Sequence, residues 1–516
     1  MAKLINITVV LFLLQMGNNL NYLYASSGKI DIQDTKSSVI NLNYPKAKVF
    51  SEQEKTKIHK RNIIDSDGWI RVGVLLPLSG KAAIIGKSLK QAAEIALFSS
   101  GNNKMILQFY DTNNVLMSVK EITKQAVSER VDVIVGPLFG KEVYDVARVA
   151  RSYDIPVISF SNDEKSLNSA KVYSINYLIS QEIDQLIGFA SSKGHKTISI
   201  IIPEDENNDM ISDAIKNTIY KYSGKIHKLG QYKKSDQISI AEAVKQVTDY
   251  QDRSDNANKI RKEIKKQLED LSCNNLNDTN TTQTQDDIND NEIKKYCDNL
   301  NKLDKSLLTI KALGKPNFDT IFVYGDVNDL ISIGSYLLYY DISKSSVKII
   351  GTSALDNRKI FTEHGYYGAW FTGKNNMHAK SFENEYAGIF NDNPSNLAML
   401  AYDVISVIAN TSKDGRFELE KLNNPGGFFG ISGLFRFADD GIVNRSFEIK
   451  EIAPNRSRII LPSAKSFNEM NMIIQNNIIK GKSSSNLDVH KRVDFDWIAE
   501  NLKSLSIEDL NTFLIE

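Results

Sequence analysis

The sequence has little of several features that mark particular classes of protein. It contains two cysteines and six histidines among 516 residues, and its 63 lysines and arginines balance 63 acidic residues. The histidines and cysteines show no HxH, HExxH or CxxC spacing, which argues against the common zinc motifs. A net charge of zero gives no overall attraction for nucleic acid or for acidic substrates. We therefore expect no metal, no cofactor and no nucleic-acid partner.

Long apolar runs are also absent after the N-terminus, so no later segment is expected to span a membrane. The N-terminus has one basic residue, Lys3, then an apolar run over 4–16, and a small residue at Ala25. This layout is typical of a cleaved secretory signal peptide over 1–25, which predicts a periplasmic location. An uncleaved membrane anchor is the alternative, although the run is shorter than the ~20 residues that a span needs. No cysteine lies near the expected cut, so a lipid anchor is not supported.

A polar, lysine-rich stretch over 26–68 predicts a flexible leader, and the pattern changes at Trp69. From there, apolar runs of about five residues alternate with longer amphipathic segments, which is typical of parallel sheets covered by helices on both faces. The alternation occurs in two successive units, as expected for a chain too long for one core. The strands are expected at 70–77, 105–110, 131–135, 155–160, 197–202, 225–231, 319–324 and 347–350. Helices are expected at 84–98, 115–128, 141–153, 181–192, 209–222, 327–340, 380–390 and 396–411.

A polar segment over 251–311 interrupts the second unit. Apolar residues recur in it at helical spacing on two stretches, which predicts a helical hairpin with a polar tip around 275–289. Cys273 and Cys297 lie at the tip ends of the two helices. In an oxidising compartment they would form a disulfide contributing about 3 kcal/mol, and the alternative is two free thiols.

Polar and small residues follow several of the predicted strands. Because ligands of open α/β sheets bind beyond the carboxyl ends of the strands, these residues are candidates for a ligand cleft. Helix capping alone is the competing explanation, since Ser and Asp are preferred at helix N-termini. The candidate cleft residues are Ser79, Gly80, Ile85, Gly136, Leu138, Phe139, Ser159, Ser161, Asn162, Asp326 and Ser353.

The sequence matches the motifs of known enzyme classes only weakly. The stretch Gly80–Ser88 follows a strand and opens a helix, as a phosphate-binding loop does, but it has five residues between its glycines where that motif needs four. No nucleophile elbow or dinucleotide fingerprint occurs. We therefore expect no enzymatic activity and assign no catalytic residue.

Several motifs resemble those of the type 1 periplasmic binding proteins of the leucine-binding kind. The stretches that carry this resemblance are 72–80 (VGVLLPLSG), 110–112, 133–139 and 155–162. More narrowly, GPLF at 136–139, FSND at 160–163, LLYY at 337–340, AYD at 401–403 and 430–437 with Asp440-Gly441 resemble the penicillin-binding protein activators. The resemblance runs from about 69 to 452.

The resemblance implies a non-catalytic protein of two lobes joined by three crossovers. Lobe 1 would cover 69–178 plus 373–427, and lobe 2 would cover 179–372 plus 428–455. A C-terminal tail over 456–516 would follow, and a hairpin turn is expected at Asp439–Gly441 between strands 434–437 and 447–449.

In amino-acid-binding relatives, positions corresponding to Ser161 and to Leu138–Phe139 hold the ligand carboxylate, and an acidic residue of the second lobe holds the amine. The corresponding loop here, 351–354, has no carboxylate, although Asp326 or Asp356 could substitute. The resemblance therefore implies a regulator of peptidoglycan synthesis that binds a peptidoglycan synthase. The alternative is a solute receptor of an ABC importer for branched-chain or other amino acids, with an ABC permease as its partner.

Overall fold

A computed structural model describes residues 68–204, 209–271, 273, 287–342, 347–374, 379–412, 416–438 and 440–483. The expected signal peptide, the leader up to residue 67 and most of the polar hairpin tip lie outside the described residues.

The first sheet has five parallel strands in the order β2-β1-β3-β4-β5. All but one residue of β1 are buried, as expected for a parallel strand covered on both faces. The carboxyl ends of β1, β3 and β4 therefore meet at one edge of the sheet. The strands are β1 (Ile70–Leu76), β2 (Met105–Asp111), β3 (Val133–Val135), β4 (Val157–Ser159) and β5 (Tyr173–Ser174).

Six helices accompany this sheet. In sequence they are α3 (Ala83–Ser100), α4 (Val119–Ser128), α5 (Gly140–Arg151), α6 (Glu164–Ala170), α13 (Ala379–Phe390) and α14 (Ala398–Thr411). α14 packs along α3, and α5 packs against both α4 and α6. The second of these helices begins at residue 119, four residues later than predicted, because Ser118 and Glu121 form a capping box there.

The second sheet has seven strands in the order β15-β14-β10-β9-β8-β6-β7. β14 runs antiparallel to both of its neighbours, β10 and β15, and the other pairs of strands in this sheet are parallel. The strands are β6 (Thr197–Pro203), β7 (Lys225–Tyr232), β8 (Thr320–Val323), β9 (Lys348–Gly351), β10 (Trp370–Gly373), β14 (Glu448–Ala453) and β15 (Arg456–Leu461).

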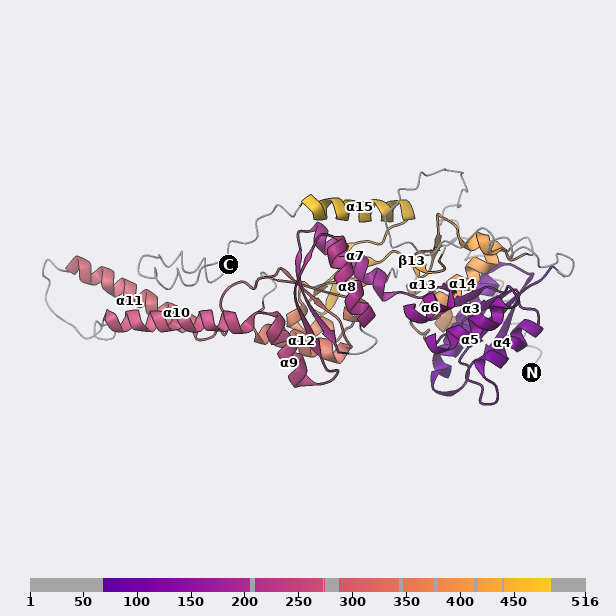
Figure 1. The fold of residues 1–516 in the computed structure, drawn as a ribbon, viewed down its shortest axis with the longest axis horizontal. Helices are drawn as coiled ribbons and strands as arrows, with labels where there is room; N and C mark the ends of the chain where they lie inside the picture. Colours follow the sequence, from indigo (N-terminus) through magenta and orange to yellow (C-terminus); the bar gives the residue numbers. More distant parts are fainter. Residues whose placement is uncertain are drawn as a thin grey trace. The chain divides into compact units, whose positions relative to one another are not determined.

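Helices cover both faces of the second sheet. Along β8, Ile321 and Val323 lie in one apolar cluster while Phe322 lies in another, as the alternation of side chains along a strand requires. Figure 1 shows α7 and α8 on one side of the sheet and α9 and α12 on the other. These helices are α7 (Ile179–Ser192), α8 (Asp209–Lys221), α9 (Gln237–Val247) and α12 (Val327–Tyr339).

The segments after residue 427 differ from the expected layout. A small antiparallel sheet of β11 (Phe428–Gly430), β12 (Gly433–Phe437) and β13 (Val443–Arg445) forms there. Side chains of β12 and β13 lie in the core of the first lobe, although the expected boundaries gave this segment to the second. The expected turn exists, but its second strand is β13 and not 447–449, because β14 pairs with β10.

The regular structure also continues past residue 455, where the tail was expected to begin. β15 extends the second sheet, and helix α15 (Phe467–Ser483) packs against α7. The alternation that predicted the other elements is weak in β15, since none of its residues is fully buried.

The insertion forms the predicted helical hairpin, α10 (Tyr250–Asp270) and α11 (Asp287–Leu307), which lie side by side in Figure 1. We call α10, α11 and the residues to Leu313 the arm. Its seam is an apolar cluster that includes Ile260, Ile264 and Leu303. Cys273 and Cys297 are disulfide-bonded, with their Cα atoms 5.5 Å apart.

Replacing both cysteines by serine should loosen the outer part of the arm and leave the two sheets unchanged. The disulfide closes a loop with a sequence separation of 24 residues, and losing it should lower the free energy of opening of the adjacent helix ends by about 3 kcal/mol. Hydrogen exchange with mass spectrometry would show faster exchange near residues 268–271 and 297–300. Unchanged exchange there, or faster exchange throughout the sheets, would contradict this assignment.

Candidate functional site

At the carboxyl end of β1, the polar groups mainly hold the loop itself. Ser79 donates its hydroxyl to the Asn113 carbonyl oxygen at 3.0 Å, and the Asn113 amide donates to the Ser79 carbonyl oxygen at 3.1 Å. Asp111 accepts from the Leu78 and Ser79 backbone N–H groups. Burial would raise the pKa of Asp111, but these hydrogen bonds and that from the Ser79 side chain hold it below its ordinary value.

Two glycines at this edge are required by the backbone. Gly136 has a φ of +113°, and a Cβ atom there would lie 2.2 Å from the Leu75 carbonyl oxygen. Gly80 has a φ of +69°, and a Cβ atom there would lie 2.2 Å from the Asn113 amide nitrogen. Both positions therefore have a structural explanation independent of any ligand.

The serines after β4 are also engaged within the lobe. Ser159 is fully buried and donates to the Pro137 carbonyl oxygen at 3.0 Å. Ser161, which is 2% exposed, accepts from the Asp163 backbone N–H at 3.1 Å. Leu138 is buried as well, so none of these three side chains is presented to solvent.

The exposed candidates of the first edge are Gly80, Asn162 and two residues with apolar side chains, Ile85 and Phe139. The structure thus brings the predicted residues of the first lobe to one edge of the sheet. It leaves that edge with an apolar surface and few free polar side chains.

At the edge of the second sheet, Ser353 is bound by a residue that the sequence did not single out. The Glu182 carboxylate accepts from the Ser353 backbone N–H at 2.8 Å, from the Ser353 hydroxyl at 2.9 Å and from the Thr372 hydroxyl at 2.6 Å. Glu182 comes from α7 and is 4% exposed. Burial raises the pKa of Glu182, and the three hydrogen bonds oppose that rise.

The two aspartates suggested as substitutes for the missing amine ligand differ in their surroundings. Asp356 accepts from the Lys450 ammonium at 3.2 Å, and Lys450 also lies 3.8 Å from Glu448. Asp326 is exposed at the N-terminus of α12 and makes no side-chain capping bond. Asp356 is therefore occupied by a protein cation, whereas Asp326 has no hydrogen-bond or ion-pair partner among the described residues.

The three segments that join the sheets meet at a cluster of aromatic and cationic side chains, which we call the hinge cluster. Tyr177 comes from the first crossover, Lys374 from the second and Arg445 from the third. The Lys374 ammonium lies 4.3 Å from the centre of the Tyr177 ring, and the Arg445 guanidinium lies 4.6 Å from it. Arg445 also lies 4.8 Å from the Phe435 ring. No local pattern in the sequence indicates this cluster, because its members come from segments up to 268 residues apart.

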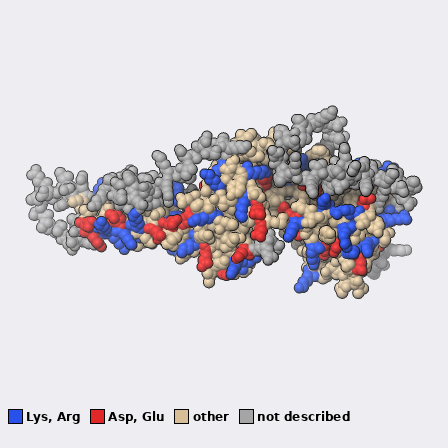
Figure 2. Space-filling model, in the orientation of Figure 1, with Lys and Arg blue, Asp and Glu red and all other residues tan. Residues whose placement is uncertain are grey.

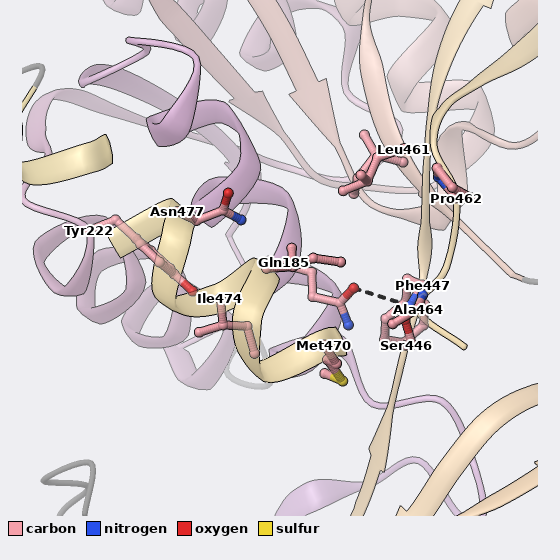
Figure 3. A pocket seen from close by; sticks show the side chains of 12 residues that line it. Gln185, Tyr222, Ser446, Phe447, Leu461, Pro462, Ala464, Met470, Ile474 and Asn477 are labelled. Atoms are coloured by element: carbon pink, nitrogen blue, oxygen red, sulfur yellow. Dashed lines mark hydrogen bonds between the residues drawn. The ribbon is translucent and has the colours of Figure 1, made fainter. Parts of the chain in front are cut away.

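A separate apolar pocket lies between α7 and α15 (Figure 3). Ile474 and Met470 of α15 line it, and Gln185 of α7 accepts from the Phe447 backbone N–H at 3.1 Å beside it. It belongs to the packing of the C-terminal helix and is not at the carboxyl ends of the parallel strands.

The described residues also bear on membrane and metal sites. Among them, no helix combines the length and apolar character needed to cross a bilayer. They contain no group of three or more His, Cys, Asp or Glu side chains placed to hold a metal ion. Figure 2 shows basic and acidic side chains interspersed over the visible face.

Comparison with known proteins agrees with this geometry. Residues 69–248 match the family model described as periplasmic binding protein. The protein RP748 of Rickettsia prowazekii, itself uncharacterized, is 22% identical over 207 residues, which are 40% of this chain and 53% of that protein. The match thus spans about half the length of that relative.

Solved structures share the fold at low sequence identity. A Rhodospirillum rubrum protein described as a branched-chain amino acid ABC transporter aligns with a TM-score of 0.55 and 13% identity, over 76% of this chain and 100% of that one. A branched-chain amino acid ABC transporter periplasmic ligand-binding protein from Burkholderia xenovorans aligns with a TM-score of 0.52 and 12% identity, over 76% of this chain and 94% of that one. An ABC transporter substrate-binding protein from Sphaerobacter thermophilus aligns with a TM-score of 0.51 and 15% identity, over 78% of this chain and 99% of that one.

These matches show that the chain has the two-lobed α/β fold of the type 1 periplasmic binding proteins. The predicted fold class is confirmed, including the parallel sheets flanked by helices.

Replacing Glu182 by alanine should lower the free energy of unfolding by about 2–4 kcal/mol. The Ser353 N–H and the Thr372 hydroxyl would lose their common acceptor in a buried place. Urea unfolding would measure the loss. A change below 0.5 kcal/mol would contradict the structural role.

Replacing Glu182 by glutamine should give a pH-dependent difference. Because burial raises the pKa of Glu182 in the folded state, the native protein binds this proton more tightly than the unfolded chain. Wild-type stability relative to Glu182→Gln should therefore fall as the pH rises from 4 to 7. The exposed Glu269→Gln is the control and should show no such trend. A difference that is flat, or that grows in favour of the wild type, would contradict the burial effect.

Proposed function

We propose that this protein is a non-catalytic regulator of the periplasm that contacts a peptidoglycan synthase through its arm. The observation that carries the proposal is the way the arm is built. It is fixed firmly at its base and closed by a disulfide, although it contributes nothing to the carboxyl ends of the strands where a small ligand would bind.

The base of the arm is held by one buried arginine. Arg253, 5% exposed, donates to the carbonyl oxygens of Gly314 at 2.8 Å, Tyr340 at 3.1 Å and Asp341 at 2.8 Å. The Asp341 carboxylate in turn accepts from the Lys311 and Ala312 backbone N–H groups. A charge buried with this many acceptors is costly to move, so the direction of the arm at its base is defined.

The flank of the arm carries exposed charge suited to a protein surface. Arg261 ties α10 to the Leu307 carbonyl oxygen at 2.6 Å. Beyond it, Lys262, Lys265 and Lys266 are exposed on two turns of α10. Two exposed acidic residues follow at the end of the same helix, so this flank supports recognition of a protein surface of complementary mixed charge, which gives speed and specificity to the encounter.

Two features of the strand ends also support this proposal over a receptor for free amino acids. The loop that would hold a ligand amine has no acidic residue of its own, and its Ser353 is bound to Glu182. The ammonium of an amino-acid ligand buried beside this loop without a counter-charge would cost free energy of binding.

A solute receptor of an ABC importer is the second candidate. It is favoured by the solved structures that share the fold, since those proteins are described as components of ABC transporters. The exposed Asp326 at the end of β8, which has no partner in the part of the chain that the structure describes, is the residue that could meet a ligand amine in that case.

Removing the arm tests the first candidate. The Leu313 backbone N–H donates to the Arg253 carbonyl oxygen at 2.9 Å, so residues 254–310 can be replaced by a two-glycine link that keeps Lys311 and Ala312 in the base. We expect the variant to melt within a few degrees of the full chain and to bind a purified peptidoglycan synthase at least 100-fold more weakly.

A matched control keeps the arm and carries Lys225→Glu, an exposed position on β7. It should bind the synthase as the wild type does. Undiminished binding by the variant without the arm would refute the proposal, and thermal stabilisation of both variants by free leucine would favour the solute receptor.

A further inference from the structure

The charged groups where the second sheet meets the hinge cluster leave one side chain unpaired. Glu182 accepts hydrogen bonds from Ser353 and Thr372, and Asp356 and Glu448 both pair with Lys450. In the described part of the chain, Lys374 has no hydrogen bond or ion pair, and its ammonium lies over the face of the Tyr177 ring. The Lys374 ammonium is therefore a cation whose N–H groups have no oxygen acceptor among the described residues.

Lys374 is held in position by its surroundings. It follows β10 directly, so its backbone lies at the carboxyl edge of the sheet, between the ends of β9 and β14. The Tyr177 ring holds one side of the ammonium at 4.3 Å from its centre, and Tyr177 is itself buried. An ammonium has three N–H donors, and contact with a ring face satisfies none of them with an oxygen acceptor.

The electrostatics of the neighbours agree with this geometry. Burial lowers the pKa of Lys374 below its ordinary value, Glu182 and Asp356 act to raise it, and Arg445 lowers it. The nearby carboxylates thus do not fully offset the cost of burying the ammonium. An oxyanion bound at Lys374 would offset it further, because an opposite charge within a few ångströms favours the charged form of the lysine.

We propose that Lys374, with the Tyr177 ring behind it, is the binding residue of an anion site that takes the carboxylate or phosphate group of a small acidic ligand. The site has the polarity opposite to that expected from the resemblance, in which the second lobe holds a ligand amine. It does not depend on the arm or on the partner proposed for it.

Thermal unfolding of the chain from residue 26 with small probes tests the site. Acetate, succinate and inorganic phosphate should raise the melting temperature, whereas acetamide, succinamide and ethanolamine at the same ionic strength should not. Comparing acetate and succinate with phosphate distinguishes the two kinds of oxyanion. If no anion raises the melting temperature at 20 mM, the site is refuted, and if ethanolamine alone does, the polarity is wrong.

Lys374→Met should weaken binding of the effective anion at least tenfold by calorimetry, and Lys374→Arg should retain part of it. Lys225→Met, at an exposed lysine of the same sheet, is the matched control and should bind as the wild type does. Equal binding by Lys374→Met and wild type would overturn the assignment. The variant without the arm should still bind the anion, so failure of the arm proposal and failure of this site are separable.

The wild-type protein provides a test that does not depend on a stable variant. An amine-reactive ester should acylate Lys374 at least fivefold more slowly when the anion is present, with Lys225 unchanged. An anion that binds without protecting Lys374 lies elsewhere, which would refute the site.

Discussion

The buried guanidinium of Arg445 is the constraint on which the junction of the two sheets depends. It is 1% exposed and donates to the Ser432 hydroxyl at 3.0 Å and to the Ile175 carbonyl oxygen. A buried cation without partners costs several kcal/mol, so these groups must stay together for the fold to be stable. Asp403 also belongs to this group of contacts, because its carboxylate accepts a hydrogen bond from the Ser432 backbone N–H at 2.9 Å. Burial raises the pKa of Asp403, although Ser432 and Arg445 oppose the rise.

This set explains local features that otherwise look unrelated. A side chain at Gly430 would place its Cβ atom 2.3 Å from the Asp403 carboxylate, so the turn between β11 and β12 needs a glycine there. Tyr177 lies against both Arg445 and Lys374, which links all three crossovers through one ring. The resulting hinge cluster fixes the end of β10 and therefore the place of Lys374, which the anion site uses.

Much of the fold could be predicted from the sequence, because apolar runs such as 197–202 are long, buried on both faces and separated by amphipathic helices. The arm could be predicted for the same reason, since Ile260 and Ile264 recur at helical spacing on one helix and Leu303 and Leu307 on the other. β15 and α15 could not, because their burial is partial and their pattern weak. The segment 428–445 was placed in the wrong lobe because nothing local in Phe435 or Val443 indicates which of two cores it joins.

The candidate site could be predicted only in outline. The rule that ligands bind beyond strand ends located Ser79, Ser161 and Ser353 correctly at the sheet edges, but it did not reveal that each is engaged by the protein itself. Glu182 and Lys374 are ordinary residues in sequence. Their significance arises from contacts across more than 170 residues, which no local pattern reports.

Hydrogen exchange of the chain from residue 26, with and without a purified peptidoglycan synthase, tests most directly whether the protein acts through its arm. We expect slower exchange on the exposed faces of α10 and α11, with the strand ends and the hinge cluster unchanged. Protection confined to the carboxyl ends of the two sheets, or none on the arm at saturating synthase, would contradict it.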